Sequence, residues 1–224
     1  MEKGLTFNMT SIELDHVFCF CSPALPEVVL FEQQGFRVDQ GIKHQGQGTA
    51  NRSIIFQENY LELIFLDSKK DAENNPLQLH HRAFWRESGA SPFGIALRGT
   101  LSDEDRQNFW EYRPSYLKSG AILIHKASGD NVPLIFVVPP RGETYGLSMF
   151  PVNWPNFDKT LLNHAVGAKK ISSVCVEGPA YRWPLSTLVS NISFNHRSSP
   201  RMAVVLDGNA KTDFVANETL SILF

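Results

Sequence analysis

The stretch HQGQGTANRSIIFQENYLELIFL, residues 44–66, contains the pattern on which the fold assignment rests. A loop with two glycines leads into two strand-like runs, 51–58 and 60–68, which the turn residues Glu58 and Asn59 separate. Upstream, residues 12–21 have the aromatic and β-branched content of a strand, residues 22–36 indicate a short helix, and residues 36–45 indicate another strand. The order predicted for residues 12–67 is therefore β, α, β, β, β.

The same order is predicted again further along the chain. A polar linker with a covering helix, 68–90, precedes a strand at 92–99 and a helix at 102–120 that begins at Ser102. Three strand-like runs follow, AILIHKAS (121–128), PLIFVVPP (133–140) and GLSMFPVNW (146–154). We expect a second βαβββ module over 91–155 and, from the strands and one short helix (180–191) of residues 156–224, a C-terminal partial module or appendage.

Two strands of the first module each carry one polar group among apolar neighbours. His16 lies in LDHVFCF (14–20) and Glu62 in YLELIFL (60–66). Because side chains alternate along a strand, each of the two groups shares its face with apolar residues, and a carboxylate buried there alone would cost several kcal/mol. Three partners for Glu62 are open at this point: a divalent metal shared with His16, a direct hydrogen bond to His16, or a contact with Asn51 or Arg52.

The loop 44–52 gathers polar groups between these strands. Its glycines permit backbone conformations that other residues avoid, and His44, Thr49 and Asn51 place donors and acceptors close together. No helix is predicted directly after it, so the loop is neither a P-loop nor a dinucleotide-binding turn. It either wraps a small polar ligand or is a tight hairpin held by its own Thr and Asn side chains.

These segments resemble the glyoxalase-like domain proteins of the vicinal oxygen chelate superfamily. The pattern H-x-G-x-G-T-x-N at 44–51, followed by YLELI, is specific to that branch, and MFPVNW (149–154) looks like the closing strand of its second module. The resemblance implies an α+β fold of paired βαβββ modules, whose curved mixed sheets enclose a cavity for a metal and a small organic substrate.

The resemblance also implies roles for individual residues. His16 and Glu62 match metal ligands for zinc, iron, nickel or manganese, and Glu62 matches the catalytic carboxylate. His44, Thr49 and Asn51 would contact the substrate, and Asn153 and Trp154 would do so from the second module. The second-module ligand positions fall near Phe93, Gly94 and Asn153, so half of the expected metal shell is missing.

Two functions therefore follow from the sequence. One is a metal-dependent lyase, isomerase or dioxygenase that uses His16 and Glu62. The alternative is a metal-free protein of the same fold that binds or sequesters a small molecule, or an accessory subunit without catalysis. The incomplete set of metal ligands favours the second.

Composition limits the partners and the compartment. The 224 residues contain 21 basic and 23 acidic side chains, and this balance argues against nucleic acid or anionic lipid as a partner. We expect no membrane segment and a cytoplasmic protein, because no apolar run approaches the length of a membrane helix and the first residues lack a signal peptide. Three cysteines without CxxC spacing predict neither disulfides nor a zinc knuckle. A homodimer is a further expectation from the resemblance.

Overall fold

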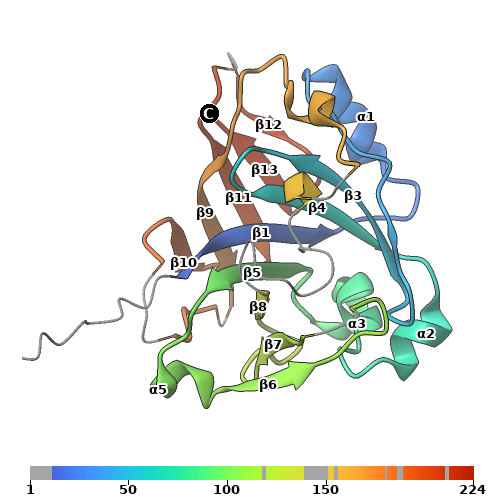
Figure 1. The fold of residues 1–224 in the computed structure, drawn as a ribbon, viewed down its shortest axis with the longest axis vertical. Helices are drawn as coiled ribbons and strands as arrows, with labels where there is room; N and C mark the ends of the chain where they lie inside the picture. Colours follow the sequence, from blue (N-terminus) through green and yellow to red (C-terminus); the bar gives the residue numbers. More distant parts are fainter. Residues whose placement is uncertain are drawn as a thin grey trace, which may run out of the picture.

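The computed structural model describes residues 12–117, 120–138, 151–153, 156–179, 181–185, 189–209 and 212–224, which form two sheets. The larger sheet has eight strands in the order β2-β3-β4-β1-β5-β8-β7-β6, and the smaller has five, in the order β10-β9-β11-β13-β12. β1 and β5 run side by side through the middle of the molecule (Figure 1).

The eight-stranded sheet is built from two halves with the same order of elements. The first half comprises β1 (Ile12–Phe20), α1 (Pro26–Gln33), β2 (Lys43–His44), β3 (Thr49–Ile55) and β4 (Tyr60–Leu66). The second half comprises β5 (Phe93–Gly99), α5 (Asp103–Arg106), β6 (Phe109–Tyr112), β7 (Ile122–His125) and β8 (Leu134–Val138). The predicted βαβββ order and the α+β vicinal oxygen chelate fold are confirmed.

The two halves also pair their strands in the same way. β1 is parallel to β4, β5 is parallel to β8, and the antiparallel pair β1–β5 joins the halves into one curled mixed sheet. The segment of the chain that connects the two halves contains three short helices, α2 (Lys69–Asn74), α3 (His80–Ala83) and α4 (Trp85–Ser88). The concave face of the curled sheet is therefore bordered by strands from both halves.

The C-terminal part of the chain forms the smaller sheet. Its elements are η1 (Pro151–Asn153), η2 (Lys159–Leu162), β9 (Ile171–Gly178), β10 (Ile192–His196), β11 (Arg201–Leu206), β12 (Phe214–Val215) and β13 (Leu220–Leu223). From β12 to β10 the pairing is antiparallel, parallel, antiparallel, parallel, which repeats the pattern from β3 to β8 in the larger sheet. The expected helix at 180–191 is wrong for its described residues, because none of 181–185 and 189–191 is helical.

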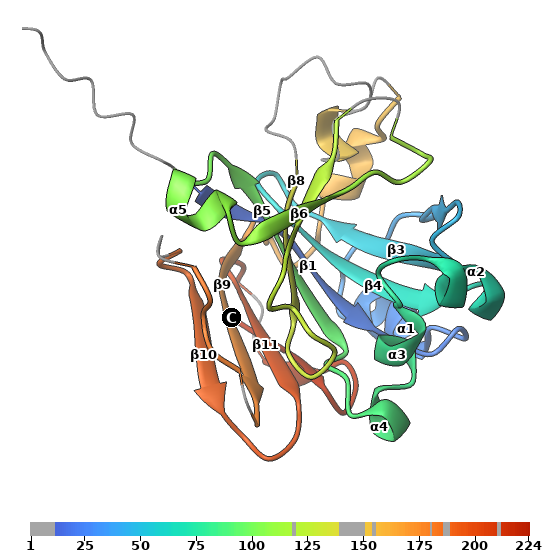
Figure 2. The ribbon, with the colours of Figure 1, turned by 90° about the horizontal axis from the view of Figure 1, so that it is seen from below.

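The two faces of the eight-stranded sheet belong to two different apolar clusters. Val17, Leu63 and Ile95 face a large apolar core that includes Val176 and Met202 of the smaller sheet. Figure 2 shows β9, β10 and β11 as a separate layer beside β1 and β5. The opposite face, with residues such as Phe18, Ile64 and Phe136, forms a second apolar cluster. The smaller sheet thus covers one face and leaves the other available for a cavity.

Two predictions in the second half are wrong. The helix expected at 102–120 is only Asp103–Arg106, although Ser102 does accept a hydrogen bond from the backbone N–H of Asp105 (3.1 Å). The aromatic run Phe109–Tyr112 forms β6 instead, because it pairs with β7 and buries Phe109 and Tyr112.

The closing strand of the second half is also earlier than predicted. β8 takes this place beside β5, whereas Pro151–Asn153 forms a 3₁₀ turn. The remainder of the predicted strand, 146–150 and Trp154, lies outside the described residues. Among the helices of the described ranges, none has the length and apolar character that a membrane crossing requires.

Candidate functional site

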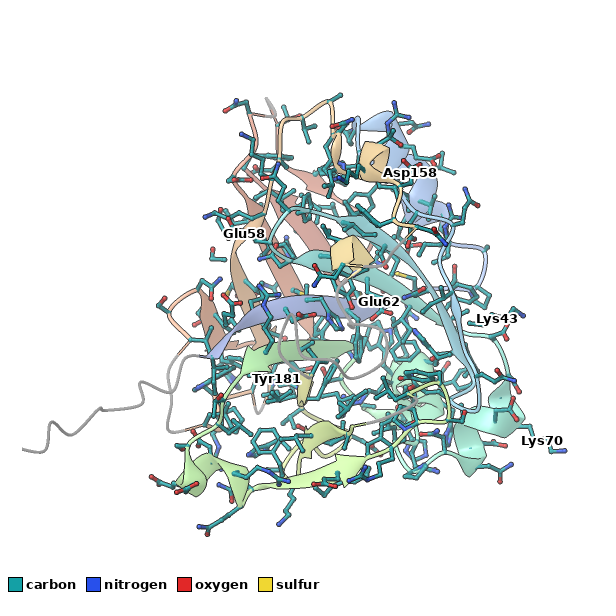
Figure 3. All side chains as sticks on the ribbon, viewed as in Figure 1. Lys43, Glu58, Glu62, Lys70, Asp158 and Tyr181 are labelled. Carbon is teal, nitrogen blue, oxygen red and sulfur yellow. The ribbon has the colours of Figure 1, made fainter. Side chains whose placement is uncertain are left out.

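A cavity of about 330 Å³ lies against the concave face of the eight-stranded sheet. Its polar lining comes mainly from the first half and includes His16, His44 and Glu62. The apolar lining of the second half is made of Tyr112, Tyr116, Leu117, Ile122, Ile124, Leu134 and Phe136. In Figure 3 the labelled Glu62 lies near the centre of the molecule, whereas Lys43 and Lys70 lie at its edge. Phe18 and Ile64 of the first half add to the apolar lining. The cavity therefore combines one polar cluster around Glu62, which we call the polar end, with largely apolar walls, as small-molecule sites commonly do.

Glu62 is the centre of the polar end. The side-chain amide of Asn51, on the neighbouring strand β3, donates a hydrogen bond to Oε1 of Glu62. The Nε2 atom of His44 lies 3.6 Å from Oε1, and the Nε2 atom of His16 lies 3.8 Å from Oε2. The described residues donate no hydrogen bond to Oε2, although only 7% of the Glu62 side chain is exposed. Because Glu62 lines the cavity, Oε2 can accept a hydrogen bond from a ligand bound there.

A buried ion pair between Asp15 and Arg98 contacts the ring of His16. A register shift between Leu14 and His16 interrupts the pairing of β1 with β5, and the Oδ1 atom of Asp15 there lies 2.8 Å from the Nδ1 atom of His16. Arg98 on β5 donates to the other oxygen of Asp15 (2.9 Å) and to the backbone carbonyl of Glu58 (2.8 Å). Because a carboxylate only accepts, Nδ1 of His16 carries a proton and donates it to Asp15, which leaves Nε2 facing Glu62.

Burial and charge explain the pKa directions at the polar end. Burial alone would raise the pKa of Asp15, but its interactions with His16 and Arg98 outweigh burial and hold that pKa below its ordinary value. Burial lowers the pKa of His44, and the nearby charge of Glu62 only partly opposes this effect. Neutral His44 is therefore favoured near pH 7.

The loop before β3 positions His44 through a chain of polar contacts. The Nδ1 atom of His44 lies 2.9 Å from the hydroxyl oxygen of Thr49, which also accepts a hydrogen bond from the amide of Gln47 (3.0 Å). Tyr116 donates from its hydroxyl to Gln47 (3.2 Å). Gly48 has a φ of +77°, and a side chain there would collide with the backbone of α2. The loop is thus a tight hairpin in which Thr49 contacts His44, and His44 lines the cavity; that the loop wraps a ligand stays a prediction.

The second half places apolar groups where further metal ligands were sought. Leu134 and Phe136 on β8 line the cavity, and the space beside Gly94 on β5 is filled by the ring of Phe18. Phe93, the other position considered, is buried in the core on the opposite face. Among the residues that the structure describes, no group of three or more His, Cys, Asp or Glu side chains could hold a metal ion. The donor set of the described cavity therefore does not fit a metal centre.

The residues predicted from sequence divide into two groups. His16, His44, Asn51 and Glu62 come together at one end of the cavity, whereas Thr49 supports His44 from outside the lining. Asn153 is exposed on η1 and does not line the cavity, and Trp154 lies outside the described residues.

Sequence reasoning missed several residues of the site. Asp15, Arg98, Gln47, Tyr116 and Phe136 were not predicted as site residues, although each contacts a polar group of the site or lines the cavity. A charged pair in otherwise apolar strands was the available signal for Asp15 and Arg98. Tyr116 and Phe136 belong to the second half and reach the site only through the tertiary fold.

Comparison with known proteins supports the architecture. Residues 14–183 match the family model described as a glyoxalase-like domain. A hypothetical protein from Staphylococcus aureus has a solved structure that is 12% identical, with a TM-score of 0.54 and coverage of 95% of this chain and 99% of that chain. Methylmalonyl-CoA epimerase from Mycobacterium tuberculosis is 14% identical, with a TM-score of 0.38 and coverage of 57% and 87% respectively. No curated protein has a significantly similar sequence. The Staphylococcus aureus structure supports the fold alone.

Proposed function

Because the chain belongs to the glyoxalase-like domain family, we propose that it binds a small amphipathic organic molecule in the cavity of the eight-stranded sheet. The polar end of the ligand contacts His16, His44 and Glu62. Its apolar part lies against Leu134 and Phe136 of the second half. The observation that supports this function best is a single cavity in which a polar cluster from the first half meets apolar walls from both halves of the sheet.

The roles proposed for the loop residues follow from their contacts. His44 and Asn51 line the cavity and contact the ligand. Thr49 acts as a positioning residue, since its hydroxyl fixes the ring of His44 and does not line the cavity. Asn153 has no role in this proposal, because it is exposed outside the cavity.

The metal-free version of the function is the better supported one. A complete shell would need donors from the second half, and the strand positions there hold Leu134 and Phe136. Asn51 also donates its amide hydrogen to Glu62 and so occupies one carboxylate oxygen. We therefore propose binding that does not depend on a metal, which is the second of the two functions expected from the sequence.

The test uses 4-phenylbutan-1-ol, a neutral probe with a polar head and an aromatic end. We expect it to raise the melting temperature equally with and without a chelator, because binding to the folded state alone is stabilising. Phe136→Ala should weaken probe binding about tenfold, since a lost aromatic wall removes one to two kcal/mol of apolar contact. Isothermal titration calorimetry measures the affinity.

A matched variant controls for a general loss of packing. Phe194 on β10 is a partly buried aromatic residue of the smaller sheet, outside the cavity. Phe194→Ala should leave probe affinity unchanged. Equal probe affinity of wild type and Phe136→Ala would show that the probe does not bind in this cavity. Loss of binding when the chelator is added would show that binding depends on a metal.

A further inference from the structure

Among the described residues that line the cavity, Glu62 is a carboxylate without a lysine or arginine within 4 Å. Asp15 pairs with Arg98 (2.9 Å), and Lys43 pairs with Asp67 (2.8 Å) on the exposed side of the loop. Burial raises the pKa of Asp39, and the nearby charge of Arg52 opposes that rise. Glu62 is paired only with imidazoles in the described part of the chain, and neither approaches to hydrogen-bond distance.

The Oε2 atom of Glu62 receives no hydrogen bond from the described residues and lies 3.8 Å from the Nε2 atom of His16. A carboxylate oxygen in this position attracts a group with several hydrogens to donate. An ammonium has three donors and no acceptor, whereas a hydroxyl donates once. A carboxylate head would place a like charge beside Glu62.

Aromatic rings lie beside the two imidazoles that adjoin Glu62. Tyr60 stacks on His16 with ring centroids 4.2 Å apart, and Phe136 meets the edge of His16 at 5.5 Å. Tyr116 lies 6.0 Å from the ring of His44. Aromatic faces attract cations through their quadrupole, and this attraction grows when water is excluded. Carboxylate and rings therefore favour the same charge in a ligand.

We propose that the ligand of the cavity is an organic amine, whose ammonium group binds between Glu62 and His16 and whose apolar part lies on Leu134 and Phe136. This inference rests on the proposed function, because it names the chemical class of the molecule bound at that site. It predicts a preference set by head-group charge: amine first, alcohol second, carboxylate last.

Three probes of the same carbon skeleton test the preference: 4-phenylbutylamine, 4-phenylbutan-1-ol and 4-phenylbutanoate. Calorimetry on the full chain at pH 7 should show the amine binding about tenfold more tightly than the alcohol, as expected for a charge-assisted hydrogen bond. The carboxylate should bind more weakly than the alcohol. The comparison needs only the wild-type protein, so it does not depend on whether a variant folds.

A variant then assigns the preference to one carboxylate. Glu62→Gln keeps the shape and the contact with Asn51 but removes the charge, so the amine should lose its advantage over the alcohol when both are measured on this variant. Glu58→Gln is the matched control, because Glu58 is an exposed carboxylate in the turn before β4, away from the cavity lining (Figure 3). This control should retain the preference of wild type.

The outcomes separate this inference from the proposed function. Equal binding of the amine and the carboxylate, or an amine advantage that survives Glu62→Gln, overturns the ammonium site. In that event, continued binding of the alcohol leaves the proposed function in place. Failure of all three probes to bind at millimolar concentration overturns both.

Discussion

The two halves of the eight-stranded sheet have the same strand order and pairing, but the polar cluster of the cavity comes from only one of them. The first half turns His16, His44 and Glu62 toward the cavity, and the second turns Leu134 and Phe136 toward it. The shared backbone therefore fixes the shape of the cavity, and the side chains alone decide what it binds. In this molecule the ligand chemistry must be inferred from each half separately.

An ion pair between Arg98 and Asp15 nevertheless connects the two halves. Arg98 belongs to the second half, yet it neutralises Asp15 and thereby orients His16 in the first. Arg98→Ala should have the largest effect, a loss of about 3–5 kcal/mol in the free energy of unfolding, because it removes the guanidinium partner of the buried carboxylate of Asp15 and leaves only its contact with His16. Urea denaturation at pH 7 measures this loss.

The control for this prediction is another arginine of the second half. Arg106 forms an exposed pair with Glu111 (3.0 Å), and Arg106→Ala should change the free energy of unfolding by less than about 1 kcal/mol. If Arg98→Ala lowered the free energy of unfolding by no more than Arg106→Ala, the first half would not depend on Arg98 of the second half for its stability.

The second prediction removes the feature that distinguishes the polar half. Glu62→Gln should raise the free energy of unfolding by about 1 kcal/mol, since a buried charge without a permanent partner is replaced by a neutral amide of the same shape. Thermal and urea unfolding at pH 7 measure this gain. Glu58→Gln, which is exposed, should stay within about 0.5 kcal/mol of wild type.

A loss of stability in Glu62→Gln would have a clear meaning. It would show that Glu62 is paired with a charge in the free protein, most directly with a protonated His16. A ligand ammonium would then compete with protonated His16 for the carboxylate of Glu62. The preference of the cavity for an amine would be smaller than proposed.

The sequence predicted the polar half far better than the apolar half. Alternation along short strands indicated that His16 and Glu62 are isolated polar groups on apolar faces, and the family resemblance named them with His44 and Asn51 as site residues; the structure places all four at the cavity. These residues belong to contiguous elements with strong local signals. The fold class followed from the same segments, through the repeated βαβββ order.

The second half depended on contacts that local patterns do not contain. The capped start at Ser102 suggested a long helix, but Phe109–Tyr112 is recruited as β6 by its pairing with β7. Likewise, β8 is the last strand of the second half because it pairs with β5. GLSMFPVNW was predicted for this place because it looks like the closing strand of the family. The pairing of Arg98 with Asp15 spans 83 positions, so no sequence window contains both.

The smallest predicted effect compares one histidine from each half. Burial lowers the pKa of His44 in the first half and of His125 in the second, so both rings are neutral in the folded protein below the pH at which they protonate in the unfolded chain. The unfolded chain then binds more protons, and the free energy of unfolding must fall as the pH drops below about 6.5. Urea denaturation between pH 7.5 and 5.5 should show this decline.

Single variants assign the decline to the two halves. His44→Asn and His125→Asn should each flatten the pH dependence, because asparagine does not titrate. The effect should be larger for His44, which is buried in the polar end beside Glu62 and His16, than for His125, which is packed against Phe109 near Asp105. A free energy of unfolding that is constant or rises on acidification would mean that the rings are protonated in the fold, and that Glu62 already has a cationic neighbour before any ligand binds.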